Sequence, residues 1–552
     1  MLRQGRTGHK LRCFPEWFPE LAKLDRLGYA RWAARRVRGH MPEKKRIYLI
    51  NPKTPQNFWA MQGALDVLGK KTTVPNAALL TLAALTPPDL GIEYIYGDEN
   101  VVPLRFDCAC DLVAITGYTL QADRVKWLSE FFKARGVPVA VGGVFATLEP
   151  ERARPLADHL FIGEAEHTWP QFLRDFVAGK AGSVYHQETF IDLTTSPPPD
   201  LSLVNAKDYF YHSVQTCRGC PNNCDFCDVV RLVGRRFRSK TIPQIMREVE
   251  NAYVSGAEMV FFSDDNFFIN RKFTFELLNA IIAWNRTLDR PLSFSTQATV
   301  QIGGDDELLK LLADARFSVI FLGLETLRKE CLEEVNKGQM ARFDPHEVVH
   351  RISSHGIMPF LGMIVGFDHD TKAVFGEIED FLDETGSPIA SVSVLNAPRH
   401  TELYRRMQRE GRLLEEFRGF WHLTTNIVPK GMTLEELYQG HKALFQRLYD
   451  PERFERRMIK WLGNVRYLTN LYSTRKKTLY RLLLILRIGR HFLFRVPGPV
   501  RRMFWNVVKF AWRTDPRLIS RAVSVLVQYW HYYDFAQGEA WQKAGLEETA
   551  AP

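Results

Sequence analysis

The chain has 552 residues, of which 45% are hydrophobic and 25% charged, values that exclude wholesale disorder and a fibrous repeat. It has no uncharged apolar stretch of transmembrane length and no N-terminal secretory signal, so we expect a cytoplasmic protein. The net charge of +10 is uneven: residues 1–40 carry +7 and residues 453–521 carry +16, which leaves −13 for the rest. The sequence therefore predicts a mildly acidic body with two basic appendages.

After a basic N-terminal segment, residues 1–45, the chain alternates strand and helix patterns over residues 46–180. Strands are predicted at residues 46–50, 92–96, 111–116, 138–142 and 159–162, and helices at 76–85, 122–134 and 168–178. Strands that alternate with helices indicate a parallel sheet covered on both faces, with ligands at the carboxyl ends of its strands. Residues 181–205, which include Ser196-Pro-Pro-Pro-Asp200, are predicted to be a linker.

A second alternating region is predicted over residues 206–400. Its six strands are expected at residues 209–216, 258–263, 292–297, 318–323, 359–366 and 389–395, with helices at 243–255, 272–285, 305–315, 328–336, 345–355 and 372–385. Six such units suggest a partial parallel barrel, whose chemistry gathers at the carboxyl ends of the strands. From about Leu403 the β signals fade, and residues 401–552 are predicted to form a helical C-terminal domain.

Four of the eight cysteines fall within the eleven residues from Cys217 to Cys227, directly after the first strand of this second region. Cys220, Cys224 and Cys227 have the spacing C-x3-C-x2-C, which suits three irons of a [4Fe–4S] cluster and leaves the fourth iron open to another ligand. A closed zinc site with Cys217 as the fourth ligand is the alternative. We favour the cluster and interpret Cys217 as a bystander thiol.

These residues resemble the signature of the radical S-adenosylmethionine (SAM) superfamily, including the aromatic Phe226 before the last cysteine. The resemblance implies that Cys220, Cys224 and Cys227 bind a [4Fe–4S] cluster, that SAM chelates the open iron, and that its reductive cleavage gives a 5′-deoxyadenosyl radical. It also implies an electron donor such as ferredoxin or flavodoxin. Polar residues at the strand ends match the superfamily's SAM contacts: Phe226, Asp264, Asp265, Asn266, Ser295, Gln297 and Glu325.

The preceding Rossmann-like region resembles the cobalamin-binding module of the cobalamin-dependent (class B) radical SAM proteins. The residues that would contact cobalamin are Thr116, Gly117, Tyr118, Gly142, Gly143, Thr147 and Glu164. No G-x-G-x-x-G or Walker A string occurs, which disfavours a dinucleotide or triphosphate, although plain turn glycines remain an alternative. The turn Asp98-Glu-Asn-Val-Val102 lacks the cobalt-binding histidine of many cobalamin proteins, so we expect base-off binding. Cys108 and Cys110 are expected to be buried core thiols.

Strings in the C-terminal third, such as Leu395-Asn-Ala-Pro-Arg399 and Thr424-Thr-Asn-Ile-Val428, resemble the branch that includes hopanoid and bacteriochlorophyll methylases, as does Asn57-Phe-Trp59. The basic residues 453–521 interleave charge with Leu, Phe and Trp, which suits an anionic membrane interface. An ordinary helical bundle with solvated basic faces is the alternative. Nucleic acid binding is disfavoured because no RNA-binding motif is recognisable.

The resulting prediction is an α/β protein with an N-terminal Rossmann-like cobalamin-binding domain, a partial (β/α)6 radical SAM barrel and a C-terminal helical extension. The resemblance implies a radical SAM methyltransferase that methylates an unactivated carbon of a lipid-like or tetrapyrrole substrate, through a 5′-deoxyadenosyl radical and methylcobalamin. Its cofactors would be the [4Fe–4S] cluster, SAM and cobalamin. Two alternatives are a ring-forming or oxidising radical SAM enzyme with the same cofactors, and a non-catalytic cobalamin or iron–sulfur sensor.

Overall fold

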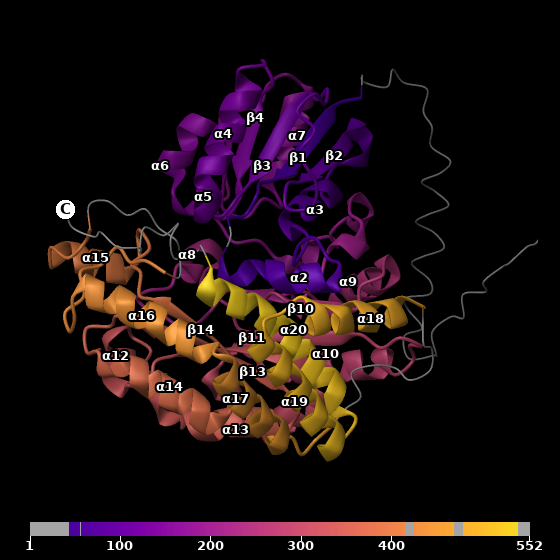
Figure 1. Cartoon of the computed structure of the whole chain (residues 1–552). Helices are drawn as coiled ribbons and strands as arrows, with labels where there is room; N and C mark the ends of the chain where they lie inside the picture. Colours follow the sequence, from indigo (N-terminus) through magenta and orange to yellow (C-terminus); the bar gives the residue numbers. More distant parts are fainter. Residues whose placement is uncertain (1–43, 56, 415–422, 469–478, 539–552) are drawn as a thin grey trace, which may run out of the picture. The chain divides into compact units, whose positions relative to one another are not determined.

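The computed structural model describes residues 44–55, 57–414, 423–468 and 479–538 (Figure 1). The basic N-terminal segment therefore lies outside the described residues, apart from its last two positions. None of the described helices combines the length and apolar character needed to cross a bilayer.

The first sheet has six parallel strands in the order β2-β1-β3-β4-β5-β6. The strands are β1 (Arg46–Asn51), β2 (Glu93–Asp98), β3 (Leu112–Thr116), β4 (Val139–Gly142), β5 (His159–Ile162) and β6 (Val184–His186). The helices around them are α3 (Ala77–Ala84), η2 (Pro88–Leu90), η3 (Thr119–Gln121), α4 (Ala122–Lys133), α5 (Gly143–Leu148), α6 (Pro150–Ala153), η4 (Arg154–Leu156) and α7 (Thr168–Val177). Between β1 and α3, the chain forms η1 (Phe58–Ala60) and α2 (Gln62–Leu68), which pack on the core of the second sheet. The predicted doubly wound sheet is confirmed.

Alternation of side chains along β1 explains why helices cover both faces of this sheet (Figure 1). Tyr48 and Ile50 join one apolar core with residues of α4, whereas Ile47 and Leu49 join a second core with residues of α3 and α7. The strand order reverses between β1 and β3, and ligands bind at such a switch point in open α/β sheets.

The segment predicted as a linker contains β6, which extends the first sheet, and three short turns of helix, η5 (Leu193–Thr195), η6 (Leu201–Leu203) and η7 (Ala206–Asp208). The interpretation of residues 181–205 as a plain linker is therefore wrong over Val184–His186. The strand was missed because three residues are too short a run to show a period-two pattern.

The second sheet also has six parallel strands, in the order β14-β13-β12-β11-β10-β7, so each strand pairs with the next along the chain. The strands are β7 (His212–Val214), β10 (Met259–Phe262), β11 (Ser293–Thr299), β12 (Phe317–Glu325), β13 (Met358–Val365) and β14 (Ile389–Val394). The intervening helices are α8 (Val229–Val233), α9 (Ile242–Ser255), α10 (Arg271–Asn285), η8 (Val300–Gly304), α11 (Asp306–Asp314), α12 (Lys329–Glu334), η9 (Gly338–Arg342), α13 (Pro345–Ser354) and α14 (Ala373–Thr385). This consecutive order is that of the predicted partial barrel.

A small antiparallel ribbon that the sequence patterns did not indicate follows β7. It pairs β8 (Cys217–Arg218) with β9 (Arg238–Ser239) and encloses the loop that carries the cysteine triad.

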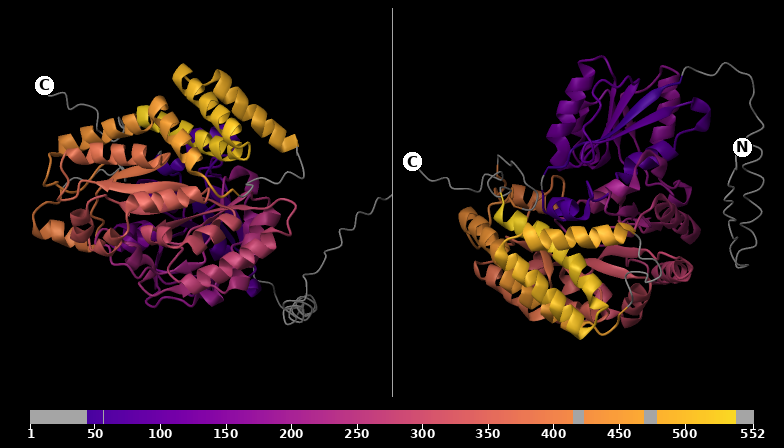
Figure 2. Two further views of the ribbon diagram at one scale, coloured as in Figure 1. Left: turned by 90° about the horizontal axis from the view of Figure 1, so that it is seen from below. Right: turned by 45° about the vertical axis from the view of Figure 1, so that its right-hand side comes forward.

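The C-terminal region is helical, as predicted: α15 (Glu402–Arg409), α16 (Leu434–Leu448), α17 (Pro451–Asn464), α18 (Leu479–Phe494), α19 (Gly498–Thr514) and α20 (Leu518–Gln537). In Figure 2 the last helices, orange to yellow, lie side by side, and their buried residues belong to the same core as the second sheet. Most of the basic residues 453–521 are therefore built on ordered helices with a buried side.

Candidate active site

The loop with the three cysteines is shaped by a glycine and closed by backbone hydrogen bonds. Gly219 has φ +95°, and a Cβ there would lie 2.1 Å from the Arg236 carbonyl oxygen, so only glycine fits this turn. The Cys220 amide donates to the Gly234 carbonyl (3.1 Å), and the Cys227 amide donates to the Cys224 carbonyl (3.1 Å). The shape of the loop is therefore set by Gly219 and by these backbone hydrogen bonds.

The three thiols suit a cluster better than a single ion. Cys220, Cys224 and Cys227 are free and half-buried. Among the described residues, the groups of metal-ligating side chains whose atoms lie within 4.8 Å of one another do not include this triad. A tetrahedral zinc with bonds of about 2.3 Å to sulfur would hold its ligands closer than that, whereas a cubane spreads its thiolates over three irons.

Burial raises the pKa of all three thiols, to about 11 for Cys224. A buried thiol is protonated near neutral pH, so iron must displace the protons. Cys217 differs from the triad because it is fully buried in β8, and burial also raises its pKa. Its place in the ribbon is compatible with the interpretation as a bystander thiol.

Asp264 and Asp265 follow β10, and the structure separates their roles. The Asp264 carboxylate accepts hydrogen bonds from the Thr216 amide (2.7 Å), the Thr216 hydroxyl (2.6 Å) and the Cys217 amide (2.9 Å). It is fully buried, which raises its pKa to about 6. Asp264 therefore fixes the turn that leads into the cysteine loop, and the half-buried Asp265 is the neighbour that remains open to a ligand.

The other predicted SAM contacts lie on β11 and β12 or just after β10, except Phe226, which lies in the cysteine loop. Ser295 is buried with no hydrogen-bond partner for its hydroxyl among the described residues, as expected of a group that binds a ligand. Gln297 is half-buried two positions further along β11. The Asn266 side chain is buried and accepts from the Phe268 amide (3.3 Å), and Phe226 packs on the apolar cluster that includes Cys331.

Glu325 ends β12 with φ +67°, at an irregularity in its pairing with β13. Its carboxylate pairs with Lys337, which is only 4% exposed and also donates to the Gly323 carbonyl (3.1 Å). The positive charge of Lys337 acts against the effect of burial on the pKa of Cys224. Sequence reasoning missed Lys337, because nothing around Val335-Asn-Lys337 marks it as part of the site.

The first sheet presents backbone rather than charge at its switch point. Thr116 ends β3, Gly117 and Tyr118 follow it, and Gly142 and Gly143 lead from β4 into α5. Gly143 has φ +88°, and a Cβ there would lie 2.3 Å from the Thr116 hydroxyl oxygen. The backbone of Gly143 therefore lies tightly against Thr116 and Gly117, an approach that only glycine allows and that brings the ends of β3 and β4 together at the switch point.

Two of the residues predicted to contact cobalamin have structural partners. The Thr147 hydroxyl accepts from the Gly163 amide (3.1 Å) and holds the turn after β5. Glu164 is buried and pairs with Arg218 (2.8 Å) and Arg238 (2.9 Å) of the β8–β9 ribbon. Burial raises the pKa of Glu164, but the hydrogen bonds from the two arginines outweigh it and lower the pKa overall. Glu164 thus joins the first sheet to the cysteine loop.

A cavity of about 320 Å³ lies where the first sheet meets the start of the second. Small residues line it on the first sheet and α3, among them Ala77, Ala78, Ala114 and Ala140, and Ser213 and Gln215 line it from β7 and the residues after it. The cavity reaches Gly142, Gly143 and Gly163. Larger apolar and charged side chains, such as Trp169 and Glu164, complete the lining, and a cavity of this size at the switch point fits part of a large cofactor.

Tyr118 connects this edge with the SAM residues. Its side chain is 57% exposed, yet the surrounding protein and the charge of Asp265 raise its pKa. Tyr118 therefore lies at the edge of the first sheet, largely exposed and near the charge of Asp265. The carboxyl ends of the two sheets meet at the cavity described above, which Gly142 and Gly143 line from the first sheet and Ser213, Gln215 and Ser263 line from the second.

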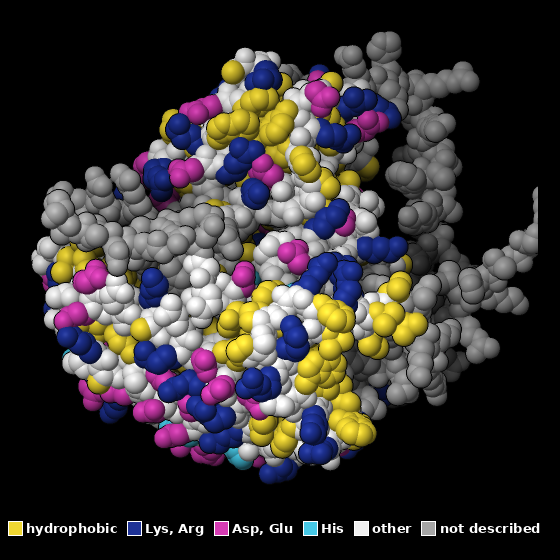
Figure 3. Space-filling model, viewed as in Figure 1, with side chains coloured by type: hydrophobic (Ala, Val, Ile, Leu, Met, Phe, Trp, Pro, Cys, Tyr) yellow, Lys and Arg dark blue, Asp and Glu magenta, His cyan; other side chains and the backbone are white. Residues whose placement is uncertain are grey.

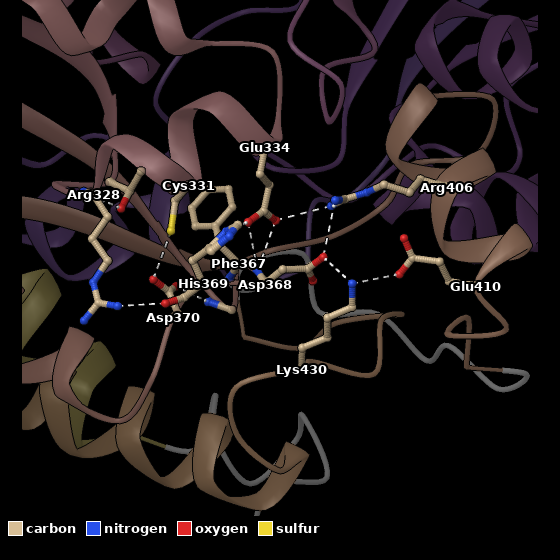
Figure 4. Close-up of polar contacts among 12 residues, drawn as sticks. Arg328, Cys331, Glu334, Phe367, Asp368, His369, Asp370, Arg406, Glu410 and Lys430 are labelled. Atoms are coloured by element: carbon tan, nitrogen blue, oxygen red, sulfur yellow. Dashed lines mark hydrogen bonds and ion pairs between the residues drawn. The ribbon is translucent and has the colours of Figure 1, made fainter.

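A second group of side chains that could bind a metal lies close to the cysteine loop, and its carboxylate, that of Glu334, is already paired with basic side chains (Figure 4). Cys331, Glu334 and His369 have ligand atoms within 4.8 Å of one another. Glu334 accepts from the Asp368 amide (3.0 Å), from His369 (2.9 Å) and from Arg406 (3.2 Å). These bonds attach α15 to the loop after β13, so we assign the cluster a structural role.

The expectation for Cys108 and Cys110 is wrong. Both are half-buried in the connection between β2 and β3, because this irregular segment lies at the margin of the core.

Comparisons with known proteins agree with this architecture. The family model of the radical SAM superfamily matches residues 214–382, and a domain of unknown function matches residues 401–543. An uncharacterised methyltransferase of Synechocystis sp. is 31% identical over 89% of this chain and 92% of its own length. The hopanoid C-2 methylase of Rhodopseudomonas palustris is 28% identical over 78% of this chain and 81% of its own length.

Two solved structures share the fold. The radical SAM methyltransferase TsrM from Kitasatospora setae, with cobalamin and a [4Fe–4S] cluster bound, has a TM-score of 0.53 at 16% identity and covers 67% of this chain and 78% of its own. The cobalamin-dependent radical SAM enzyme OxsB has a TM-score of 0.58 at 12% identity and covers 90% of this chain and 84% of its own. The cysteine triad, the matching family model and the 31% identical relative show that the chain belongs to the radical SAM superfamily, and it shares its fold with cobalamin-dependent members of that superfamily.

Proposed function

We propose that this protein is a methyltransferase that uses a [4Fe–4S] cluster, SAM and cobalamin to methylate an unactivated carbon of a lipid-like or tetrapyrrole substrate. The observation that carries the proposal is the cavity shared by the two sheets, which Gly142, Gly143 and Gly163 line from the first and Ser213, Gln215 and Ser263 line from the second. When bound, the three cofactors supply a hydrogen-abstracting radical and a transferable methyl group.

The chain's own residues position these groups. Cys220, Cys224 and Cys227 would hold the cluster, and Asp265, Ser295 and Gln297 would contact SAM. The glycines of β4 and the residues after β3 would hold cobalamin at the switch point, and no step requires a histidine in the turn after β2. Asp264 and Lys337 act on the cysteine loop through hydrogen bonds and charge rather than by touching the substrate.

An aromatic surface on the second sheet supports an apolar ring system as substrate. Trp59, in η1, stacks on Phe360 with ring centroids 5.3 Å apart and meets Phe321 edge-on at 5.2 Å. Trp59 keeps 37% of its surface exposed, so this aromatic group is not closed off by protein. Relatives are named for hopanoids and bacteriochlorophyllides, both large ring systems.

The test is anaerobic reconstitution of the full chain with iron, sulfide and cobalamin. We expect the visible absorption of a [4Fe–4S] cluster, retained cobalamin, and formation of both 5′-deoxyadenosine and S-adenosylhomocysteine when reductant and lipid extract are added. Deuterium from methyl-labelled SAM should appear in one lipid or pigment. Formation of 5′-deoxyadenosine alone would favour the ring-forming or oxidising alternative, and cobalamin binding without SAM cleavage would favour the sensor.

We further propose a cytoplasmic location at the inner face of the membrane and reduction by a ferredoxin or flavodoxin. The basic helices after residue 453 support the membrane contact, because anionic lipids attract Lys and Arg. The proposed electron donor is tested by replacing the chemical reductant of the reconstitution assay, such as dithionite, with reduced flavodoxin. Reduced flavodoxin should support SAM cleavage.

A further inference from the structure

The surface of α18 and α19 carries many basic side chains and many exposed apolar side chains, with no acidic residue in these helices. Residues 482–514 contain seven Lys and Arg and no Asp or Glu. Large apolar side chains on the same helices are exposed: Leu482, Leu483, Ile485, Leu486, Leu493, Phe494, Trp505 and Trp512. Figure 3 shows hydrophobic and basic side chains next to each other over these helices, at the lower right of the view.

The exposed apolar groups are not the packing face of α18. Ile488 and Phe492 are buried at helical spacing, and Phe492 stacks on Phe504 of α19 with centroids 4.0 Å apart. The core side of the helix is therefore satisfied, while Ile485 and Phe494 are 66% and 76% exposed. Exposed patches of this kind mark interaction sites.

A cavity of about 600 Å³ lies at the foot of this surface, between α2, α18 and α20. Its polar lining consists of Arg487, Arg490 and His491 from α18, Arg495 directly after α18, and Asp66 from α2. Arg487 donates to the Asp66 carbonyl (2.6 Å), and the Asp66 carboxylate accepts from Gln62 (3.2 Å). The cavity thus has three guanidinium groups for one carboxylate.

Three donors in this cavity lack partners among the described residues. The Arg490 and Arg495 guanidinium groups form no ion pair there, and the buried Nε2 of His491 has no hydrogen-bond partner. The His491 ring packs against Trp530, with centroids 5.1 Å apart, which fixes its place in the wall. Burial and the nearby Arg495 lower the pKa of His491, so its neutral ring is favoured.

We propose that this cavity binds the phosphate of an anionic phospholipid and that the exposed apolar side chains of α18 enter the same leaflet. Convergent arginines are suited to phosphate oxygens, and an interfacial helix with Lys and Arg beside Leu, Phe and Trp is the arrangement that anionic bilayers bind. Charge complementarity and the adjacent apolar surface together select a lipid over a free anion. The inference deepens the proposed membrane contact and does not depend on methyl transfer.

The test is sedimentation of the cofactor-loaded full chain with vesicles. We expect binding to vesicles of phosphatidylcholine mixed with phosphatidylglycerol, and little binding to phosphatidylcholine alone. The double variant R490E/R495E should reduce binding to the anionic vesicles by at least about tenfold, because each basic residue near the surface contributes on the order of one kcal/mol. The matched control R247E/K310E reverses the same charge on exposed positions of α9 and α11 and should bind like the parent.

A second pair of variants keeps the test decisive if the charge reversal disturbs folding. I485S/F494S leaves the cavity intact and should weaken binding while preserving the preference for anionic vesicles. R490Q/R495Q should lose that preference with unchanged thermal unfolding and cobalamin retention. Failure of methyl transfer with intact vesicle binding would count against the proposed function alone.

Three outcomes would overturn the inference. The first is equal binding of R490E/R495E and the parent to anionic vesicles. The second is equal binding to both vesicle types. The third is absence of vesicle binding together with binding of inorganic phosphate or of RNA that depends on Arg490 and Arg495, which would assign the cavity to a free anion or a nucleic acid.

Discussion

The two six-stranded sheets offer different kinds of groups to a ligand at the carboxyl ends of their strands. The first offers backbone and small side chains, with Gly142 and Gly143 at the switch point and alanines around the adjoining cavity. The second offers thiols and buried charge, from Cys224 to Asp264 and Lys337. The shape of the backbone would select the ligand in the first sheet, and thiols and charged groups would select it in the second. Separate substitutions should therefore abolish binding at one sheet without affecting binding at the other.

The largest effect is expected from the thiols of the second sheet. Cys224→Ala removes one of the three proposed cluster ligands, so the visible cluster absorption should disappear and SAM cleavage should fall to background. Cobalamin retention should persist, since the first sheet is untouched. Cys331→Ala, at a thiol assigned a structural role, serves as the control and should keep its cluster. A cluster of full intensity in Cys224→Ala would contradict the assignment.

In the first sheet, Gly143→Val should abolish cobalamin retention while the cluster still assembles. The new side chain would collide with Thr116 and occupy space at the switch point. Gly136→Val is matched in conformation, with φ +72° and nothing within 4 Å of a Cβ. It should cost about 1–2 kcal/mol of folding free energy through backbone strain alone and keep cobalamin. Equal cobalamin binding by both variants would show that the glycine serves only the turn.

The ion pairs between the sheets should contribute most of their stability near neutral pH. Glu164→Gln leaves Arg238 without a carboxylate partner, whereas Arg218 keeps its ion pair with Glu166 (2.7 Å). The variant should destabilise the apoprotein by about 3 kcal/mol, the lower end of the range for a buried pair that loses one partner. Because the pKa of Glu164 is lowered in the folded state, its contribution is complete above the unfolded pKa of about 4.5 and lost as pH falls through the folded pKa. Thermal unfolding should therefore separate the variant from the parent at pH 7, with convergence in acid.

The exposed pair of Lys126 and Glu130 provides the control for this experiment. Glu130→Gln should change the unfolding free energy by less than about 1 kcal/mol, as is usual for surface pairs. A difference between Glu164→Gln and the parent that stayed constant down to strongly acidic pH would argue against an electrostatic origin.

The smallest effect is expected at Lys337. The double variant K337M/E325Q removes a buried pair without leaving an unpaired charge and withdraws a cation from the cysteine loop. The reduced cluster should become harder to form, so its reduction potential should move to a more negative value, with SAM cleavage slowed by less than about tenfold. Potentiometric titration followed by electron paramagnetic resonance measures the shift. An unchanged potential would restrict Lys337 to a packing role.

Most of the fold could be predicted from local patterns in the sequence. The strands from β1 to β5 and from β10 to β14 were expected within a few residues, because hydrophobic runs between turn residues are visible in the chain. The cysteine triad was equally visible because its three ligands lie within eight residues. Neighbouring residues are what sequence patterns can detect.

The missed features depend on contacts between distant residues. Lys337 lies far along the chain from Cys224, and the pairing of Glu164 with Arg238 joins two sheets. The separate roles of Asp264 and Asp265 depend on which carboxylate reaches the backbone of β8, a matter of side-chain direction after the strand. Composition located the basic helices but gave no sign of the cavity that α18 shares with α2.

The β8–β9 ribbon also limits the distance between two parts of the proposed site. Arg218 forms an ion pair with Glu164, which follows β5 of the first sheet. Cys220 comes only two residues after Arg218, a chain path of at most about 7 Å. The distance between Glu164, beside the proposed cobalamin site, and Cys220, a proposed cluster ligand, is thereby fixed by a few peptide bonds instead of by a flexible linker. An insertion of even one residue between Arg218 and Cys220 would lengthen that span, so this is the stretch of chain in which changes of length should be least tolerated.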